Sequence, residues 1–212
     1  MGSNVLNKNL LNAAIKGDTD SVEEMASEGA LVDAADGNGR TGLWHAARSG
    51  DSDMVQVLLK LGADTGEADN DGLTPLVAAI QNLNWRVAKQ LIEMGDINHQ
   101  MGETHFTALH AAVNLDLRDE NTNRVTFLMK AGANALIADS TGTTALARAQ
   151  EHAKKWPFAK ELVELIEEFK DGPAAREKYL ADKRDRGIVS EMQGTVAAVP
   201  APATARFRRP QP

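Results

Sequence analysis

The chain contains no cysteine among its 212 residues. Without a thiol it can form neither a disulfide bond nor a zinc–thiolate site, and no thiolate can act as a nucleophile. The absence fits a protein of the reducing cytoplasm, which is the location we expect.

Long apolar runs are also missing, and aromatic residues make up only 4% of the chain. A helix needs roughly 18 to 20 consecutive apolar residues to cross a bilayer, and no run approaches that length. The first six residues, MGSNVL, lack the basic-then-apolar pattern of a secretion signal. They also lack the Ser or Thr that a myristoylation motif needs at position 6. We therefore expect no membrane partner.

Positive charge is scarce in most of the chain. Residues 1–170 hold 15 basic and 25 acidic residues, a net charge of −10, whereas residues 171–212 hold 8 basic and 5 acidic residues, a net charge of +3. Contacts to phosphates supply most of the non-specific affinity for nucleic acids, and they need basic side chains. An acidic body therefore argues against a nucleic-acid partner.

One six-residue pattern recurs at regular intervals. Residues 74–79 read Thr-Pro-Leu-Val-Ala-Ala, and related stretches occupy residues 8–13, 41–46, 107–112 and 144–149. The first four copies begin 33 residues apart, at positions 8, 41, 74 and 107. A period of this length indicates a stacked array, in which each unit cannot bury its apolar face alone and neighbouring units share one core.

Each copy has the composition of a helix start. A Thr hydroxyl at the N-cap accepts a backbone N–H, and Pro with its fixed φ suits the first turn. Leu and small Ala residues three and four apart then give a narrow apolar face. Gly17 and Gly50, nine residues after the first two starts, suit the left-handed conformation that ends a short helix. A second amphipathic helix follows in each unit. The second helices are expected to end at Gly29, Gly62, Gly95 and Gly132.

The linker between units carries a turn signature. Residues 36–39, 69–72 and 139–142 each begin with Asp and end with Gly, as a type I turn prefers. In the fourth unit residues 102–105 read Gly-Glu-Thr-His instead, so the Asp is lost and His105 stands where Gly is expected. We predict a positive φ at His105 and a distorted turn.

These features together resemble the ankyrin-repeat family, in five copies over about residues 4–169. The resemblance rests on the 33-residue period, the Thr-Pro-Leu start, the ending Gly62-Ala63-Asp64 and the Asp-x-x-Gly turn. It implies an all-α ankyrin-repeat solenoid of five stacked helix-turn-helix units with protruding β-turn fingers. The repeats are placed at about 4–36, 37–69, 70–102, 103–139 and 140–170, within one domain over residues 1–170.

Residues beyond this domain differ in composition. We predict a short helix or linker over residues 171–186 and a largely disordered tail over residues 187–212, where too little can be buried to offset the entropy of ordering. The tail carries Arg206-Phe207-Arg208-Arg209. This cluster is either solvated or docks on an acidic groove, including one on this protein itself.

Several units depart from the pattern. Gly132 lies 25 residues after Thr107, whereas Gly62 lies 21 after Thr41, and we place the four extra residues in a loop at residues 115–123 between two helices. Such a loop either decorates the surface or confers specificity. In the fifth unit Trp156 and Pro157 are expected to open the second helix. Trp85 of the third unit is expected to pack in the outer layer.

The resemblance implies a non-enzymatic protein–protein interaction module, a scaffold or adaptor that binds a partner on a concave surface and is monomeric by itself. The alternative is a dedicated inhibitor or immunity-type protein that blocks one enzyme or toxin. No cofactor is expected. The resemblance, carried over position by position, predicts these partner-binding residues: Asn38, Arg40, Trp44, Arg48, Asp71, Leu73, Gln81, Asn82, Phe106, Asn114 and Leu115.

Two aromatic residues in this set allow more than one interpretation. Trp44 replaces the family's usual His, so it either packs with its indole N–H paired or contacts the partner directly. Leu73, Phe106 and Leu115 together would form an apolar patch with a polar rim, the anatomy of a protein interface. Alternatively, the distorted turn folds Phe106 inward.

The sequence shows few residues in patterns typical of a catalytic or metal site. The histidines are scattered, and the glycines follow the repeat rather than a phosphate-binding pattern. His99, Glu103 and His105 form the one cluster that suggests a metal, but they lie in a turn without an obvious fourth ligand, so we expect no metal. His110 matches the family's structural His and is not expected to be catalytic.

Overall fold

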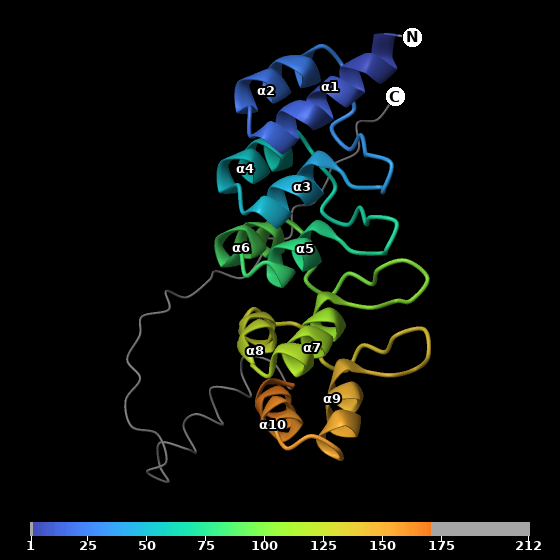
Figure 1. The fold of residues 1–212 in the computed structure, drawn as a ribbon, viewed down its shortest axis with the longest axis vertical. Helices are drawn as coiled ribbons and strands as arrows, with labels where there is room; N and C mark the ends of the chain where they lie inside the picture. Colours follow the sequence, from blue (N-terminus) through green and yellow to red (C-terminus); the bar gives the residue numbers. More distant parts are fainter. Residues whose placement is uncertain (1, 171–212) are drawn as a thin grey trace, which may run out of the picture.

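The computed structural model describes residues 2–170 and shows a stack of paired helices (Figure 1). The predicted segments at residues 171–186 and 187–212 lie outside the described residues. Within the described part the helices are α1 (Gly2–Lys16), α2 (Thr19–Ser27), α3 (Gly42–Ser49), α4 (Ser52–Lys60), α5 (Pro75–Gln81), α6 (Trp85–Met94), α7 (Ala108–Asp119), α8 (Asn123–Lys130), α9 (Ala145–Ala153) and α10 (Ala159–Phe169).

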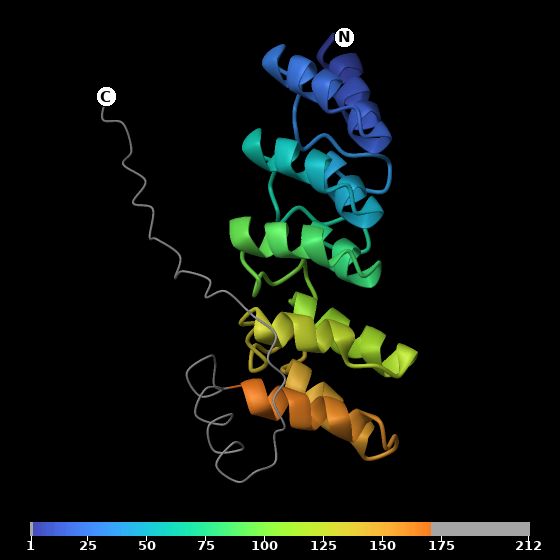
Figure 2. The same cartoon turned by 90° about the vertical axis from the view of Figure 1, so that its left-hand side faces the viewer.

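The helices form two layers. The first helices of the units stack in one column, and the second helices stack in the other (Figures 1 and 2). The first column holds α1, α3, α5, α7 and α9, and the second holds α2, α4, α6, α8 and α10. The turns between units extend as fingers on the side of the first column (Figure 1). This arrangement confirms the predicted all-α solenoid of five units. In the part of the chain described, no helix is long and apolar enough to span a bilayer.

The helix starts follow the predicted capping chemistry. The Thr41 hydroxyl accepts the backbone N–H of Trp44 at 3.2 Å, and Thr144 accepts that of Ala147 at 3.0 Å. Pro75 occupies the first turn of α5, where its missing N–H costs nothing. Two of the second helices, α2 and α4, use a device that the sequence pattern did not reveal, an Asp N-cap at Asp18 and Asp51. Asp51, for example, accepts the N–H of Met54 at 3.0 Å.

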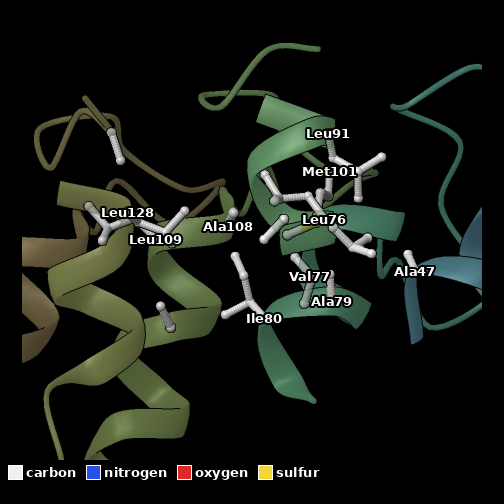
Figure 3. Close-up of a cluster of buried hydrophobic side chains, with 14 of the residues drawn as sticks. Ala47, Leu76, Val77, Ala79, Ile80, Leu91, Met101, Ala108, Leu109 and Leu128 are labelled. Atoms are coloured by element: carbon white, nitrogen blue, oxygen red, sulfur yellow. The ribbon is translucent and has the colours of Figure 1, made fainter. Parts of the chain in front are cut away.

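A continuous apolar core lies between the layers. The equivalent leucines of units two to five, Leu43, Leu76, Leu109 and Leu146, are at most 8% exposed. Figure 3 shows Leu76, Val77 and Ile80 of α5 between Ala47 of α3 and Leu109 of α7. Small residues such as Ala79, which is completely buried, let adjacent helices approach closely. The repeated Leu-x-Ala-Ala pattern therefore specifies stacking rather than a separate core in each unit.

Regular fingers are held by one aspartate each. In the third unit the carboxylate of Asp69 accepts the backbone N–H groups of Asp71 and Leu73 at 3.0 and 2.9 Å. Asp36 and Asp139 bond their own turns in the same way. An isolated bridge closes the finger at Ala35 and Thr41, and another at Ala138 and Thr144. The predicted Asp-x-x-Gly turns are thus confirmed.

The finger of the fourth unit is distorted, as predicted. His105 has a φ of 54°, and the closing bridge joins Met101 to Phe106, one residue earlier than in the regular fingers. The backbone N–H of Met101 donates to the Phe106 carbonyl at 2.7 Å. The side-chain amide of Gln100 donates to the His105 and Ala138 carbonyls at 3.3 and 3.0 Å, which ties this finger to the next.

Three predicted boundaries were wrong. The first helix begins at Gly2 instead of near residue 8. The four extra residues of the fourth unit do not form a loop: they lengthen α7 to 12 residues. Four residues are close to one helical turn, so the helix continues without changing its buried face. Trp156 and Pro157 precede α10, which begins at Ala159.

Candidate functional site

The predicted concave surface corresponds to the fingers and the exposed sides of α3, α5, α7 and α9. Asn38 and Asp71 lie exposed at finger tips, and Arg48, Asn82 and Asn114 lie exposed on the helices. Gln81 and Leu115 are half-buried on α5 and α7. The five exposed side chains among these are all polar or charged, so this side of the array offers solvent a row of polar groups.

Trp44 is buried rather than displayed. Its side chain is 3% exposed, and its indole N–H donates to the Leu73 carbonyl of the next finger at 3.1 Å. The guanidinium groups of Arg40 and Arg48 lie over its ring, 4.4 and 5.6 Å from the ring centroid. Of the two interpretations of Trp44, packing with a paired N–H is the one observed. A partner would meet the arginines that cover the ring.

The two arginines over Trp44 differ in whether an ion pair fixes their side chains. Arg40 is fixed by an ion pair with the buried Asp69 carboxylate at 3.4 Å. Arg48 is exposed and forms no ion pair with any residue in the described range. The ring of Trp44 orients the Arg48 guanidinium while leaving its N–H donors available.

The predicted apolar patch is largely turned inward. Leu73 and Phe106 are half-buried and pack against the core. The Phe106 ring stacks on His110, with centroids 5.3 Å apart, and the Arg148 guanidinium lies 4.8 Å above its centroid. The inward alternative therefore describes Phe106 better than a protruding anchor does.

His110 joins the fourth and fifth units. It is completely buried, its Nδ1 accepts the Thr107 backbone N–H at 3.2 Å, and its Nε2 lies 3.1 Å from the Thr143 carbonyl. Burial lowers the pKa of His110, so the neutral ring donates from Nε2. Trp44 makes the equivalent bond between the second and third units. Both residues therefore connect neighbouring units through a ring N–H.

The extra turn of α7 contains a buried ion pair that sequence reasoning missed. Asp116 accepts from the Arg124 guanidinium at 3.0 Å and from the Val125 backbone N–H at 2.9 Å. The Nε of Arg124 also donates to the Ile80 carbonyl of the third unit at 3.3 Å. Burial raises the pKa of Asp116 despite the adjacent cation. The insertion thus connects the third and fourth units.

The outer layer at the same junction is filled by aromatic residues. The Trp85 ring of α6 lies 5.0 Å from the Phe127 ring of α8, which confirms the packing role expected for Trp85. His99, Glu103 and His105 are exposed. Among residues 2–170 the structure shows no group of three or more His, Asp or Glu side chains arranged to hold a metal ion.

Stacked helix pairs, a shared core and projecting fingers define the class of protein, a helical repeat array whose fingers extend along one side. A family model for ankyrin repeats, with three copies, matches residues 10–101. Residues 10–101 therefore carry ankyrin repeats, and the structure continues the same helix-pair unit twice beyond the match. A comparison with curated proteins found no match. Ankyrin repeats are generic protein–protein interaction modules and are typically non-catalytic.

Proposed function

We propose that this protein binds one partner protein on the concave surface formed by its fingers and first-column helices, and that it acts as a scaffold or adaptor without catalysis of its own. The family supports protein binding in general. The exposed residues Asn38, Arg48, Asp71, Asn82 and Asn114 support this particular surface, because none of their side chains is buried in the array.

Arg48 carries the proposal. An exposed arginine that is held over a buried aromatic ring has already lost part of its rotamer freedom, so it pays less entropy when it binds. Arginine is also enriched among the residues that dominate binding energies. Arg48 lacks an internal ion pair in the described residues, and we infer that its partner presents a carboxylate there.

The acidic body makes nucleic acid an unsuitable partner, and we expect the protein to be monomeric by itself. An inhibitor or immunity-type role remains the second candidate function. Tight one-to-one binding that abolishes the activity of the captured enzyme or toxin distinguishes this role from that of a scaffold.

The test is affinity capture from an extract of the source cells, followed by mass spectrometry, with three forms of the full chain. They are the unchanged protein, Arg48→Glu and the control Lys60→Glu, whose altered residue is exposed at the end of α4. We expect one dominant partner whose affinity falls by more than about tenfold with Arg48→Glu, because a hot-spot arginine contributes about 2 kcal/mol or more. Equal capture by Arg48→Glu and the unchanged protein would refute the assignment.

Phe106→Glu is a less suitable test. The stacked, half-buried position of Phe106 predicts that a charge there also weakens the junction with the fifth unit, so lost capture would not separate binding from folding.

A further inference from the structure

A groove of about 650 Å³ lies between the fourth and fifth units, and Asn114 of the proposed concave surface lies at its edge as one of the lining residues. Leu117, Arg118 and Glu120 at the end of α7 form one wall, and Trp156, Pro157 and Phe158 before α10 form the other. In Figure 2 the turns that follow α7 and α9 lie along the right-hand edge and project beyond the turns of the first three units.

Two departures from the repeat create this groove. The extra turn of α7 carries Leu117 and Glu120 past the positions where α3 and α5 end. Residues 154–158 then separate α9 from α10, whereas only residues 50 and 51 separate α3 from α4. Of the residues predicted for the concave surface, only Asn114 also lines the groove, so most of the groove is distinct from that surface.

The lining has the character of a peptide-binding site. Trp156 is 58% exposed, an unusual position for the largest apolar side chain, and Pro157 extends the apolar wall. At the rim, Arg118 is neutralised by Asp119 at 2.9 Å. Glu120 forms no ion pair within residues 2–170. Within the described residues the groove thus combines an aromatic and proline surface with a carboxylate that has no ion-pair partner, and Arg118 and His152 also belong to its lining.

We propose that residues 199–209 of the same chain occupy this groove. The segment reads Val-Pro-Ala-Pro-Ala-Thr-Ala-Arg-Phe-Arg-Arg. Aromatic-lined grooves bind proline-containing segments, which lose little entropy on docking. The proposed docking pairs Pro200 and Pro202 with Trp156, and Arg206 and Arg208 with Glu120. The net charge of +3 after residue 170 opposes the −10 of the body and favours the same contact.

The chain length between the two sites suits this docking. About 30 residues separate Lys170 from Pro200, and a coil of that length spans roughly 30 Å on average. The groove lies at the other end of α10, whose 11 residues cover roughly 17 Å. When a linker matches the span, the effective concentration of the tethered segment reaches about the millimolar range. Weak contacts are then sufficient to fill the groove.

The absence of cysteine gives a direct test. Ala205→Cys in the full chain provides a single site for a nitroxide spin label, and the three tryptophan indoles give three N–H signals in a ¹⁵N NMR spectrum. We expect the label to broaden the Trp156 indole signal selectively. Trp44, buried in the second unit, and Trp85, in the third, serve as internal references.

Two variants test the docking contact. Glu120→Lys should restore the Trp156 signal, whereas the control Glu164→Lys, on an exposed position of α10, should leave the broadening intact. An undiminished Trp156 signal, or equal broadening of all three indoles, would overturn the proposal. Broadening that appears when spin-labelled protein without ¹⁵N is mixed with unlabelled ¹⁵N protein would assign the groove to the tail of a second copy and would also overturn it.

Discussion

At the scale of single residues, Trp44 and His110 perform one task with different rings. Each donates a ring N–H to a carbonyl in the next finger, at Leu73 and Thr143 respectively. The sequence predicted that the indole N–H of Trp44 needs a partner, but it could not supply the acceptor, which lies in the neighbouring unit. The sequence left two orientations open for Phe106. The inward one is observed, directly after His105 with its positive φ.

Replacing Trp44 tests this bond. Trp44→Phe keeps an aromatic ring under Arg40 but removes the indole donor, so the Leu73 carbonyl keeps only its bond from the Asp69 backbone N–H at 3.0 Å. We expect a loss of about 1 kcal/mol in the free energy of unfolding, measured by urea denaturation. Trp85→Phe is the control, because it retains the ring contact with Phe127. Equal stability of Trp44→Phe and the unchanged protein would show that the hydrogen bond is unimportant.

At the scale of elements, the sequence predicted the helix pairs and the regular fingers because each depends on local chemistry, such as a Thr cap, a Gly with positive φ or an Asp in a turn. The length of α7 was not predictable in this way. An insertion of four residues has the same sequence appearance as a loop, and only its buried partner, Arg124 with Asp116, shows that it continues a helix. Residues 117 and 120 therefore became groove residues that sequence reasoning did not single out.

The Asp139 finger predicts a pH dependence. Hydrogen bonds from the Thr141 hydroxyl and from the Thr143 and Thr141 backbone N–H groups hold the pKa of Asp139 well below its ordinary value of 3.8. A carboxyl group with a lowered pKa in the folded state stabilises the protein above its unfolded pKa, and this stabilisation is lost as the pH falls below that value. Asp139→Asn should therefore destabilise the protein at neutral pH and less so in acid.

Urea titrations of the unchanged protein and Asp139→Asn, from about pH 6 to about pH 2, measure this difference. The gap between the two free energies of unfolding should narrow below about pH 4. The fourth finger has no carboxylate at the equivalent position, which Gly102 occupies, so it cannot contribute to this pH dependence. A gap that stays constant with pH would contradict the role assigned to the Asp139 carboxylate.

At the scale of the whole molecule, five units share one core, and the proposed binding positions lie on two surfaces, the concave surface and the groove. The concave surface is inherited from the repeat, so its location was predictable, although which of its residues remain free was not. The groove between the fourth and fifth units arises where the repeat is broken, in the part of the chain that lies outside the family match to residues 10–101. Regular positions therefore indicate the fold, whereas irregular positions indicate what is particular to this protein.

Site-specific photo-cross-linking in the source cells tests the central claim, that a partner protein binds the concave surface. A photoreactive residue placed at Asn82, exposed at the end of α5, should cross-link to the captured partner. The same residue placed at Gln56, exposed on α4 in the second column, should not. Cross-linking from position 56 in place of position 82 would contradict the account and move the binding site to the opposite side of the array.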